Sequence, residues 1–275
     1  MFIVPLNEFI DLSSNYNEVL IDDGFNYIIN FLFQVVEGSL GGVYVCGITR
    51  EGSLGLKVQF FNRSQTSTKI RLYKILDPHI LATNHKSDNP AVIGTKKNFL
   101  KIPVGYTEIP MVIHSIEEIE RRDLYHFLFQ IIDGSKQIHV ANMKLDSIHS
   151  VSLLTLGFSN SGQAESIINL NILSVDFQVC HSSEPPPMAG IDLKEVGKQE
   201  ITIDSNSSGK IEIPPSKPNA TILHYTFNNK SEKKNAYVCG QYWNEKVLII
   251  EFFNESTENA TIEVSGWETY PYESN

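Results

Sequence analysis

A hairpin with an asparagine in its turn is encoded three times in this chain of 275 residues. Each copy has a run in which every second residue is apolar, then an Asn in a polar turn, and then a second alternating run. Alternation with a period of two places one side of a strand on a core, and a polar interval of fixed length between two such runs predicts a β-hairpin. The matching positions are Leu56, Val58, Phe60, Asn62 and Ile70; Leu154, Leu156, Phe158, Asn160 and Ile168; and Leu248, Ile250, Phe252, Asn254 and Ile262.

Further correspondences extend the copies beyond the hairpin. Small residues precede it at matching places, and the segments F-L-F-Q, F-L-F-Q and I-L-H-Y align in the strand before that. These positions are Cys46, Ala141 and Cys239, and Leu32, Leu128 and Leu223. The pattern predicts an internal repeat of about 95 residues. We therefore expect an all-β chain of three tandem antiparallel β-sandwich domains, immunoglobulin-like or jelly-roll-like, each with a modest core.

Polar and Pro-rich stretches set the expected boundaries. The three repeats span residues 1–78, 91–180 and 198–275, with a polar linker at 79–90 and a Pro-rich linker at 181–197. Three consecutive prolines in the second linker favour an extended and fairly stiff spacer.

The second repeat carries an insert, S-I-E-E-I-E-R-R-D-L, from Ser115 to Leu124. Ser115 and Glu118 resemble a capping box, and Ile116 and Ile119 fall on one side of a helix, so a short helical insert is expected. Its charges fit either a solvated helix face or a knob that docks on a neighbouring subunit.

Charge and hydropathy exclude some classes of partner. The formal net charge of −10 argues against nucleic acid, because proteins that bind it concentrate Lys and Arg on one face. No run approaches the roughly 18 apolar residues that a membrane span needs. The N-terminal sequence M-F-I-V-P-L-N-E-F-I-D-L lacks the pattern of a secretory signal. We expect synthesis in the cytoplasm, with later incorporation into an extracellular or particle assembly left open.

The three cysteines, Cys46, Cys180 and Cys239, are too few for the disulfide framework of a small secreted domain. Cys46 and Cys239 occupy corresponding strand positions in different repeats. They are either buried thiols or partners in an intermolecular disulfide between subunits. Cys180 lies beside a linker and is expected to be the more exposed thiol.

Four aromatic residues gather in the third repeat alone: Tyr242, Trp243, Trp267 and Tyr270. Exposed aromatic side chains at loop tips can stack on sugars or anchor a protein ligand. Packing against the edge of the core is the alternative interpretation.

No motif for covalent, metal or cofactor chemistry is present. The chain has no G-x-S-x-G elbow, no H-E-x-x-H, no C-x-x-C, no phosphate-binding loop and no G-x-G-x-x-G. His139 stands where the other repeats have Tyr44 and Tyr237, which favours a packing role over a role as base or metal ligand. We expect no enzyme activity, no catalytic residue, no metal and no cofactor.

These observations favour a non-enzymatic structural protein, a surface or coat protein that self-assembles into a filament, coat, appendage or shell. Its partner would be further copies of itself, joined by strand addition at the edges of the sandwiches. The alternative is a module that binds a carbohydrate or a protein through variable loops and the aromatic residues of the third repeat.

Overall fold

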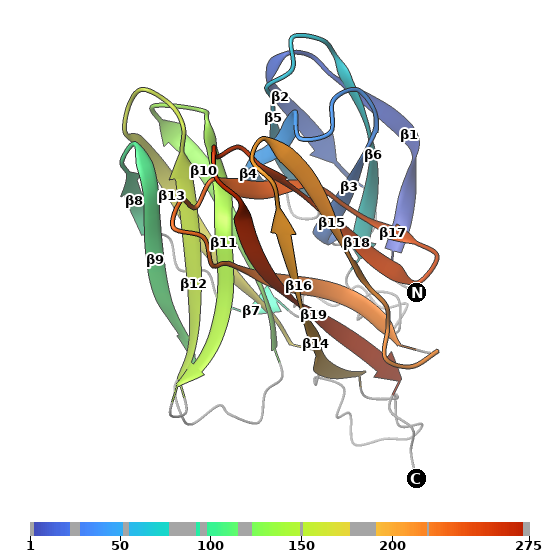
Figure 1. The fold of residues 1–275 in the computed structure, drawn as a ribbon. Helices are drawn as coiled ribbons and strands as arrows, with labels where there is room; N and C mark the ends of the chain where they lie inside the picture. Colours follow the sequence, from blue (N-terminus) through green and yellow to red (C-terminus); the bar gives the residue numbers. More distant parts are fainter. Residues whose placement is uncertain are drawn as a thin grey trace.

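The computed structural model describes residues 3–22, 28–51, 55–76, 92–93, 98–114, 123–148, 151–176, 191–218 and 220–271. Within these ranges the chain forms strands in three sheets of antiparallel strands and contains no helix (Figure 1). The all-β prediction is confirmed. In the part of the chain that the structure describes, no helix has the length and hydropathy needed to cross a membrane.

The strands divide into three groups along the chain. The first third contains β1 (Ile3–Leu12), β2 (Asn15–Ile21), β3 (Ile28–Glu37), β4 (Val43–Glu51), β5 (Gly55–Asn62) and β6 (Thr68–Leu76). The middle third contains β7 (Val92–Ile93), β8 (Asn98–Ile102), β9 (Gly105–His114), β10 (Asp123–Asp133), β11 (Ile138–Ile148), β12 (Val151–Asn160) and β13 (Ser166–Asp176). The last third contains β14 (Ile191–Ile203), β15 (Ser207–Ile213), β16 (Thr221–Asn229), β17 (Ala236–Asn244), β18 (Val247–Asn254) and β19 (Ala260–Pro271).

Each sheet combines strands from two thirds of the chain. The first sheet has the order β1-β6-β3-β17-β18-β15, so it joins the first third to the last. The second has the order β2-β5-β4-β10-β13-β7, with β8 also paired to β13, and the third has the order β14-β19-β16-β11-β12-β9. The second sheet therefore joins the first third to the middle, and the third sheet joins the middle to the last. The sharing is cyclic, and every third contributes strands to two sheets.

The alternating residues of the three hairpins are buried as predicted. None of them is more than 3% exposed. In each third a Phe ring of one sheet meets a Phe ring of the other sheet edge-on, with centroids 5.3 to 5.4 Å apart, a favoured geometry for aromatic pairs. The pairs are Phe33 with Phe60, Phe129 with Phe158, and Phe227 with Phe252. The two sheets that each third supplies thus pack face to face in a sandwich-like manner.

The alignment of Leu223 with Leu32 and Leu128 is wrong. Leu32 pairs with Tyr73, and Leu128 pairs with Asn171. Tyr73 and Asn171 each lie three residues after the first buried Ile of their strand. In the last third of the chain the residue at that position is Ser265, and it pairs with Thr226. The segment Y-T-F-N, not I-L-H-Y, therefore corresponds to F-L-F-Q. The bulge between Ile222 and His224 corresponds to the one between Ile28 and Asn30 in β3, which supports this alignment.

Several expected segments fall outside the described residues. These are the linker at 79–90, residues 181–190 of the second linker, and residues 115–122 of the insert. The last two insert residues, Asp123 and Leu124, belong to strand β10. Residues 191–197 are also part of a strand and not of a spacer, because β14 pairs with the long strand β19 from Ile191 onward.

The three turn asparagines make the same hydrogen bonds. Each Nδ2 donates to a carbonyl at the end of an edge strand and to the carbonyl four residues ahead, at 2.7 to 3.2 Å. Each Oδ1 accepts the backbone N–H two residues ahead at 3.0 Å. Asn62, Asn160 and Asn254 are at most 1% exposed. Asparagine suits this site because one side chain can satisfy buried donors and acceptors together.

Gly41 lies where the first and last thirds of the chain meet. Its φ is +84°, and a Cβ on it would lie 2.1 Å from the ring of Phe253. We expect Gly41→Ala to lower the free energy of unfolding by about 2–3 kcal/mol, from backbone strain and steric overlap.

Gly105→Ala is the matched control, because Gly105 has a φ of +98° but no atom within 4 Å of an added Cβ. Denaturant unfolding of both variants separates the two terms, and we expect a loss of only about 1 kcal/mol at Gly105. Equal losses at the two glycines would show that the close approach to Phe253 has no energetic consequence.

Candidate functional site

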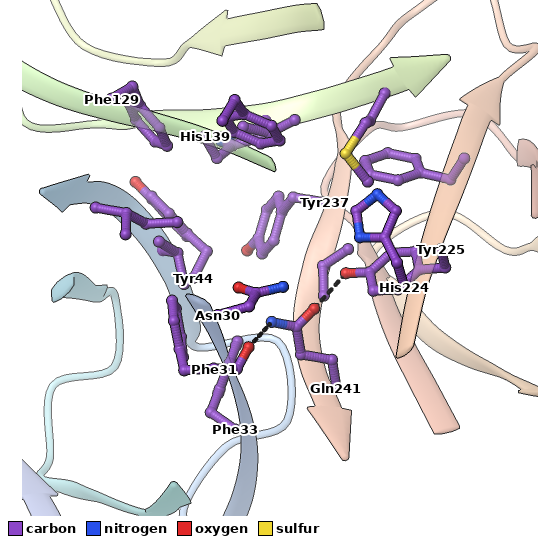
Figure 2. A pocket seen from close by; sticks show the side chains of 17 residues that line it. Asn30, Phe31, Phe33, Tyr44, Phe129, His139, His224, Tyr225, Tyr237 and Gln241 are labelled. Atoms are coloured by element: carbon purple, nitrogen blue, oxygen red, sulfur yellow. Dashed lines mark hydrogen bonds between the residues drawn. The ribbon is translucent and has the colours of Figure 1, made fainter. Parts of the chain in front are cut away.

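The three sheets meet at a cluster of three rings contributed by β4, β11 and β17. These strands contact one another, and each places one aromatic side chain in the cluster. The ring centroids lie 5.2 Å apart for Tyr44 and His139, 5.0 Å for Tyr44 and Tyr237, and 4.6 Å for His139 and Tyr237. None of the three residues is more than 1% exposed. The positions that correspond in the sequence therefore converge at one place in the fold (Figure 2).

A cavity of about 100 Å³ lies beside this ring cluster, and we call it the central cavity. Its walls come from β3, β10 and β16 and from the three strands that carry the cluster. Most of the lining is apolar or aromatic, including Phe31, Phe33 and Phe129 (Figure 2). No Asp, Glu, Lys or Arg occurs among the described residues that line it. The central cavity is therefore an uncharged, largely aromatic space at the junction of all three sheets.

Three polar atoms of the ring cluster have no hydrogen-bond partner. The Tyr44 hydroxyl and both ring nitrogens of His139 are buried and unpaired. Burial lowers the pKa of His139 from 6.5 to about 3, and the positive charge of Arg63 acts in the same direction. His139 is thus neutral at physiological pH, with one nitrogen able to donate and the other able to accept.

Gln241 bridges two walls of the central cavity. Its Nε2 donates to the backbone oxygen of Phe31 at 3.2 Å, and its Oε1 accepts the Tyr225 hydroxyl (Figure 2). Gln241 is also the residue through which β17 pairs with β3, opposite Phe33. At the other two sheet junctions Ile48 and Met143 occupy this place. The amide therefore makes one of three similar junctions polar.

Replacing Gln241 by Met, the residue found at another junction, is expected to cost about 1–3 kcal/mol of stability because the Phe31 oxygen and the Tyr225 hydroxyl lose their partner. Gln199→Met in the exposed strand β14 is the matched control, since Gln199 makes one hydrogen bond at the surface. Chemical denaturation of the two variants is the measurement. If the unfolding free energy falls no more for Gln241→Met than for Gln199→Met, the hydrogen bonds of Gln241 do not stabilise the fold.

The aromatic residues predicted to bind a ligand do not form one exposed platform. Tyr242 and Trp243 are neighbours on β17 and so point to opposite faces of the first sheet, whereas Trp267 and Tyr270 belong to β19 in the third sheet. Tyr242, Trp243 and Trp267 are half-buried and pack against the core. The Tyr242 hydroxyl donates to Glu251 Oε1 at 3.1 Å. The side chain of Tyr270 lies outside the described residues.

Cys46 and Cys239 are free thiols with no exposed surface. Each is the unpaired residue of a β-bulge in its strand, and Ala141 takes the corresponding place in β11. Burial raises the pKa of both thiols to about 12, which leaves little reactive thiolate. A disulfide from either thiol to another subunit would require these strands to open. Cys180 lies outside the described residues.

Comparisons with known proteins add no further assignment. No protein-family model matches the chain, and neither curated proteins nor solved structures gave a significant match. Among the described residues, no group of three or more His, Cys, Asp or Glu side chains is placed to hold a metal ion.

The sequence pattern did not predict the central cavity, although it indicated three of the residues that line it. The correspondence of Tyr44, His139 and Tyr237 singled out three of its residues. The lining residues on β3, β10 and β16 could not be predicted, because these strands reach the cavity through pairings between distant parts of the chain.

Proposed function

We propose that this protein is a non-enzymatic structural subunit that associates with further copies of itself through the unpaired edges of its sheets. The observation that supports this is the location of exposed apolar side chains. Phe9 is 52% exposed on β1, Leu20 is 58% exposed on β2, and Phe99 is 70% exposed on β8. Each of these strands is paired on one side only in the described residues. An exposed strand edge with large apolar residues favours addition of another strand.

Two of these edges repeat the same feature. Phe9 pairs with Arg71, and Phe99 pairs with Asn169. Arg71 and Asn169 each come one residue after the first buried Ile of their strand. Arg71 lies over the Phe9 ring at 4.9 Å from the centroid and covers only part of it. A neighbouring copy that paired with β1 or β8 would cover the exposed ring and satisfy free backbone groups together.

The finer arrangement is part of the same proposal. We propose that the three thirds of the chain are tandem copies of one β-sandwich unit. The recurrent Phe pairs, the three identical Asn turns and the cyclic sharing of strands support it. Such a chain would have the organisation of a trimer in one molecule and would offer similar edges in several directions, as a subunit of a shell or filament requires.

Mass measurement by size-exclusion chromatography with light scattering, over a concentration series, tests the proposed function. We expect discrete oligomers or filaments of the wild-type chain and their loss in the double variant Phe9→Ser, Phe99→Ser. Leu40→Ser is the matched control, because Leu40 is 50% exposed but lies in a loop and not on an edge. A monomer of 31.0 kDa at high concentration would contradict the proposal. Oligomers that disappear only with reductant would assign association to a thiol, and not to the edges.

A further inference from the structure

The edge strands β1 and β8 present corresponding side chains on the outer faces of their sheets. Ile10 on β1 and Leu100 on β8 each pair with the first buried Ile of the neighbouring strand, so the two edges can be aligned. The residues on either side of them are exposed, because alternate side chains of a strand point to opposite faces. These exposed residues are Phe9 and Asp11 on β1, and Phe99 and Lys101 on β8. The two edges therefore carry the same aromatic ring beside charges of opposite sign.

The charges on these two edges are not held by strong ion pairs. Asp11 lies opposite Lys69, but the Nζ of Lys69 is bound to Glu37 at 3.0 Å. Lys101 pairs with Glu165 at 3.3 Å, and both side chains are exposed, which is a kind of ion pair that contributes little to stability. Asp11 and Lys101 therefore remain available to another molecule.

The corresponding edge in the last third of the chain, β14, lacks both features. Ile201 pairs with the first buried Ile of β19, which places Glu200 at the position of the Phe and Thr202 at the position of the charge. Glu200 is bound by Lys230 at 2.8 Å. Charged side chains on an edge strand disfavour the addition of another strand. Each copy thus offers one edge of the β1 kind and one of the β8 kind.

We propose, on the basis of the self-association proposed above, that β1 of one copy pairs with β8 of the next, so that the copies join head to tail. Antiparallel pairing with Ile10 opposite Leu100 places the two Phe rings diagonally on one face, together with the two charges. Diagonal neighbours in a sheet are within reach of aromatic and long side chains. Pairing of β1 with β1, or of β8 with β8, instead places like charges together, which is unfavourable. Opposite charges therefore select the contact between β1 and β8.

The two edges lie apart in the molecule, so one copy can use both at once (Figure 1). Because the two partners contribute different surfaces, the contact is heterologous, and its repetition produces a closed ring or an open filament. In either case the first sheet of one copy continues into the second sheet of the next. The assembly is a chain with two contacts per copy and not a shell.

Mixing two single variants tests the head-to-tail contact, with masses measured by size-exclusion chromatography and light scattering. Phe9→Ser removes the ring from β1 alone, and Phe99→Ser removes it from β8 alone. We expect each variant to stay a monomer at concentrations where the wild type associates. A mixture of the two should form a complex of twice 31.0 kDa through the intact β8 of one and the intact β1 of the other. Leu20→Ser is the matched control and should associate like the wild type, since Leu20 is 58% exposed on another edge strand, β2.

Three results would overturn the head-to-tail contact and leave self-association through the edges standing. They are dimers of either Phe variant on its own, a mixture that stays monomeric while the wild type associates, and a loss of association in Leu20→Ser. A wild-type chain that is monomeric at every concentration would contradict self-association itself, and the head-to-tail contact with it.

An exchange of the two charges tests the same contact without removing a ring. Asp11→Lys and Lys101→Asp should each weaken association about five- to tenfold, because each places like charges together. Both changes in one chain should restore the affinity to within about twofold of the wild type, since opposite charges meet again. Thr202→Lys, at the corresponding position of β14, is the matched control and should have no effect. A double variant that associates more weakly than either single variant would overturn the proposal.

Discussion

Replacing Asn254 by alanine is expected to lower the free energy of unfolding by about 3–5 kcal/mol, one of the largest effects of any single substitution in this chain. Asn254 has no exposed surface. Its Nδ2 donates to the backbone oxygens of Ile203, Asp204 and Glu258, and its Oδ1 accepts from Ser256. Alanine would remove all of these hydrogen bonds, and although the Glu258 oxygen would keep its bond from the Ser256 hydroxyl, the desolvation cost of the other groups adds to the loss. Urea or guanidinium unfolding measures the loss.

Two further variants serve as controls for the loss of stability in Asn254→Ala. Asn254→Asp keeps an acceptor for the Ser256 N–H but removes both N–H donors, so it should recover little of the stability. Asn244→Ala, at the exposed end of β17, should change the unfolding free energy by less than about 0.5 kcal/mol. A loss below about 1 kcal/mol at Asn254 would show that the Asn turn is not a structural requirement.

Acid is expected to destabilise the protein through His139, by about 3 kcal/mol between pH 6.5 and pH 4. Burial lowers the pKa of His139 in the folded chain to about 3, from 6.5 for the free side chain. Over this interval the unfolded chain therefore binds a proton that the folded chain does not. Stability from this residue is complete above pH 6.5 and is lost as the pH falls toward the folded value.

His139→Leu provides the control for this pH dependence. The variant lacks the titrating group, so its unfolding free energy should fall less steeply between pH 6.5 and pH 4 than that of the wild type. Chemical denaturation at a series of pH values gives both slopes. Parallel slopes for the two proteins would show that His139 takes up its proton equally well in the folded and unfolded states.

Local sequence pattern was enough to predict the strands and their buried faces. Leu56, Val58 and Phe60 alternate with polar residues over a short span, and burial of one strand face requires only that alternation. The Asn turn was also visible, because Asn62 and its counterparts stand at a constant distance from the next apolar run. Interactions within about ten residues were therefore readable from the sequence alone.

The sheet assembly was not predictable in the same way. Gln241 pairs with Phe33, far away in the chain, and no periodicity indicates which distant strand will be its neighbour. The same limit hid the central cavity, whose walls are brought together by such pairings. The displaced alignment of Leu223 has another cause: Thr226 stands where the other two segments have Leu, so the letters I-L-H-Y resemble F-L-F-Q more than the structurally matching Y-T-F-N does.

Calorimetric unfolding tests most directly whether the three thirds of the chain, joined through shared sheets, form one body. Because each third supplies strands to two sheets, no third can unfold without exposing the edges of its neighbours. We expect one transition, with a calorimetric enthalpy equal to the van't Hoff enthalpy and with tryptophan fluorescence and circular dichroism changing together. Two or three separable transitions would contradict it, because they would show thirds that unfold independently.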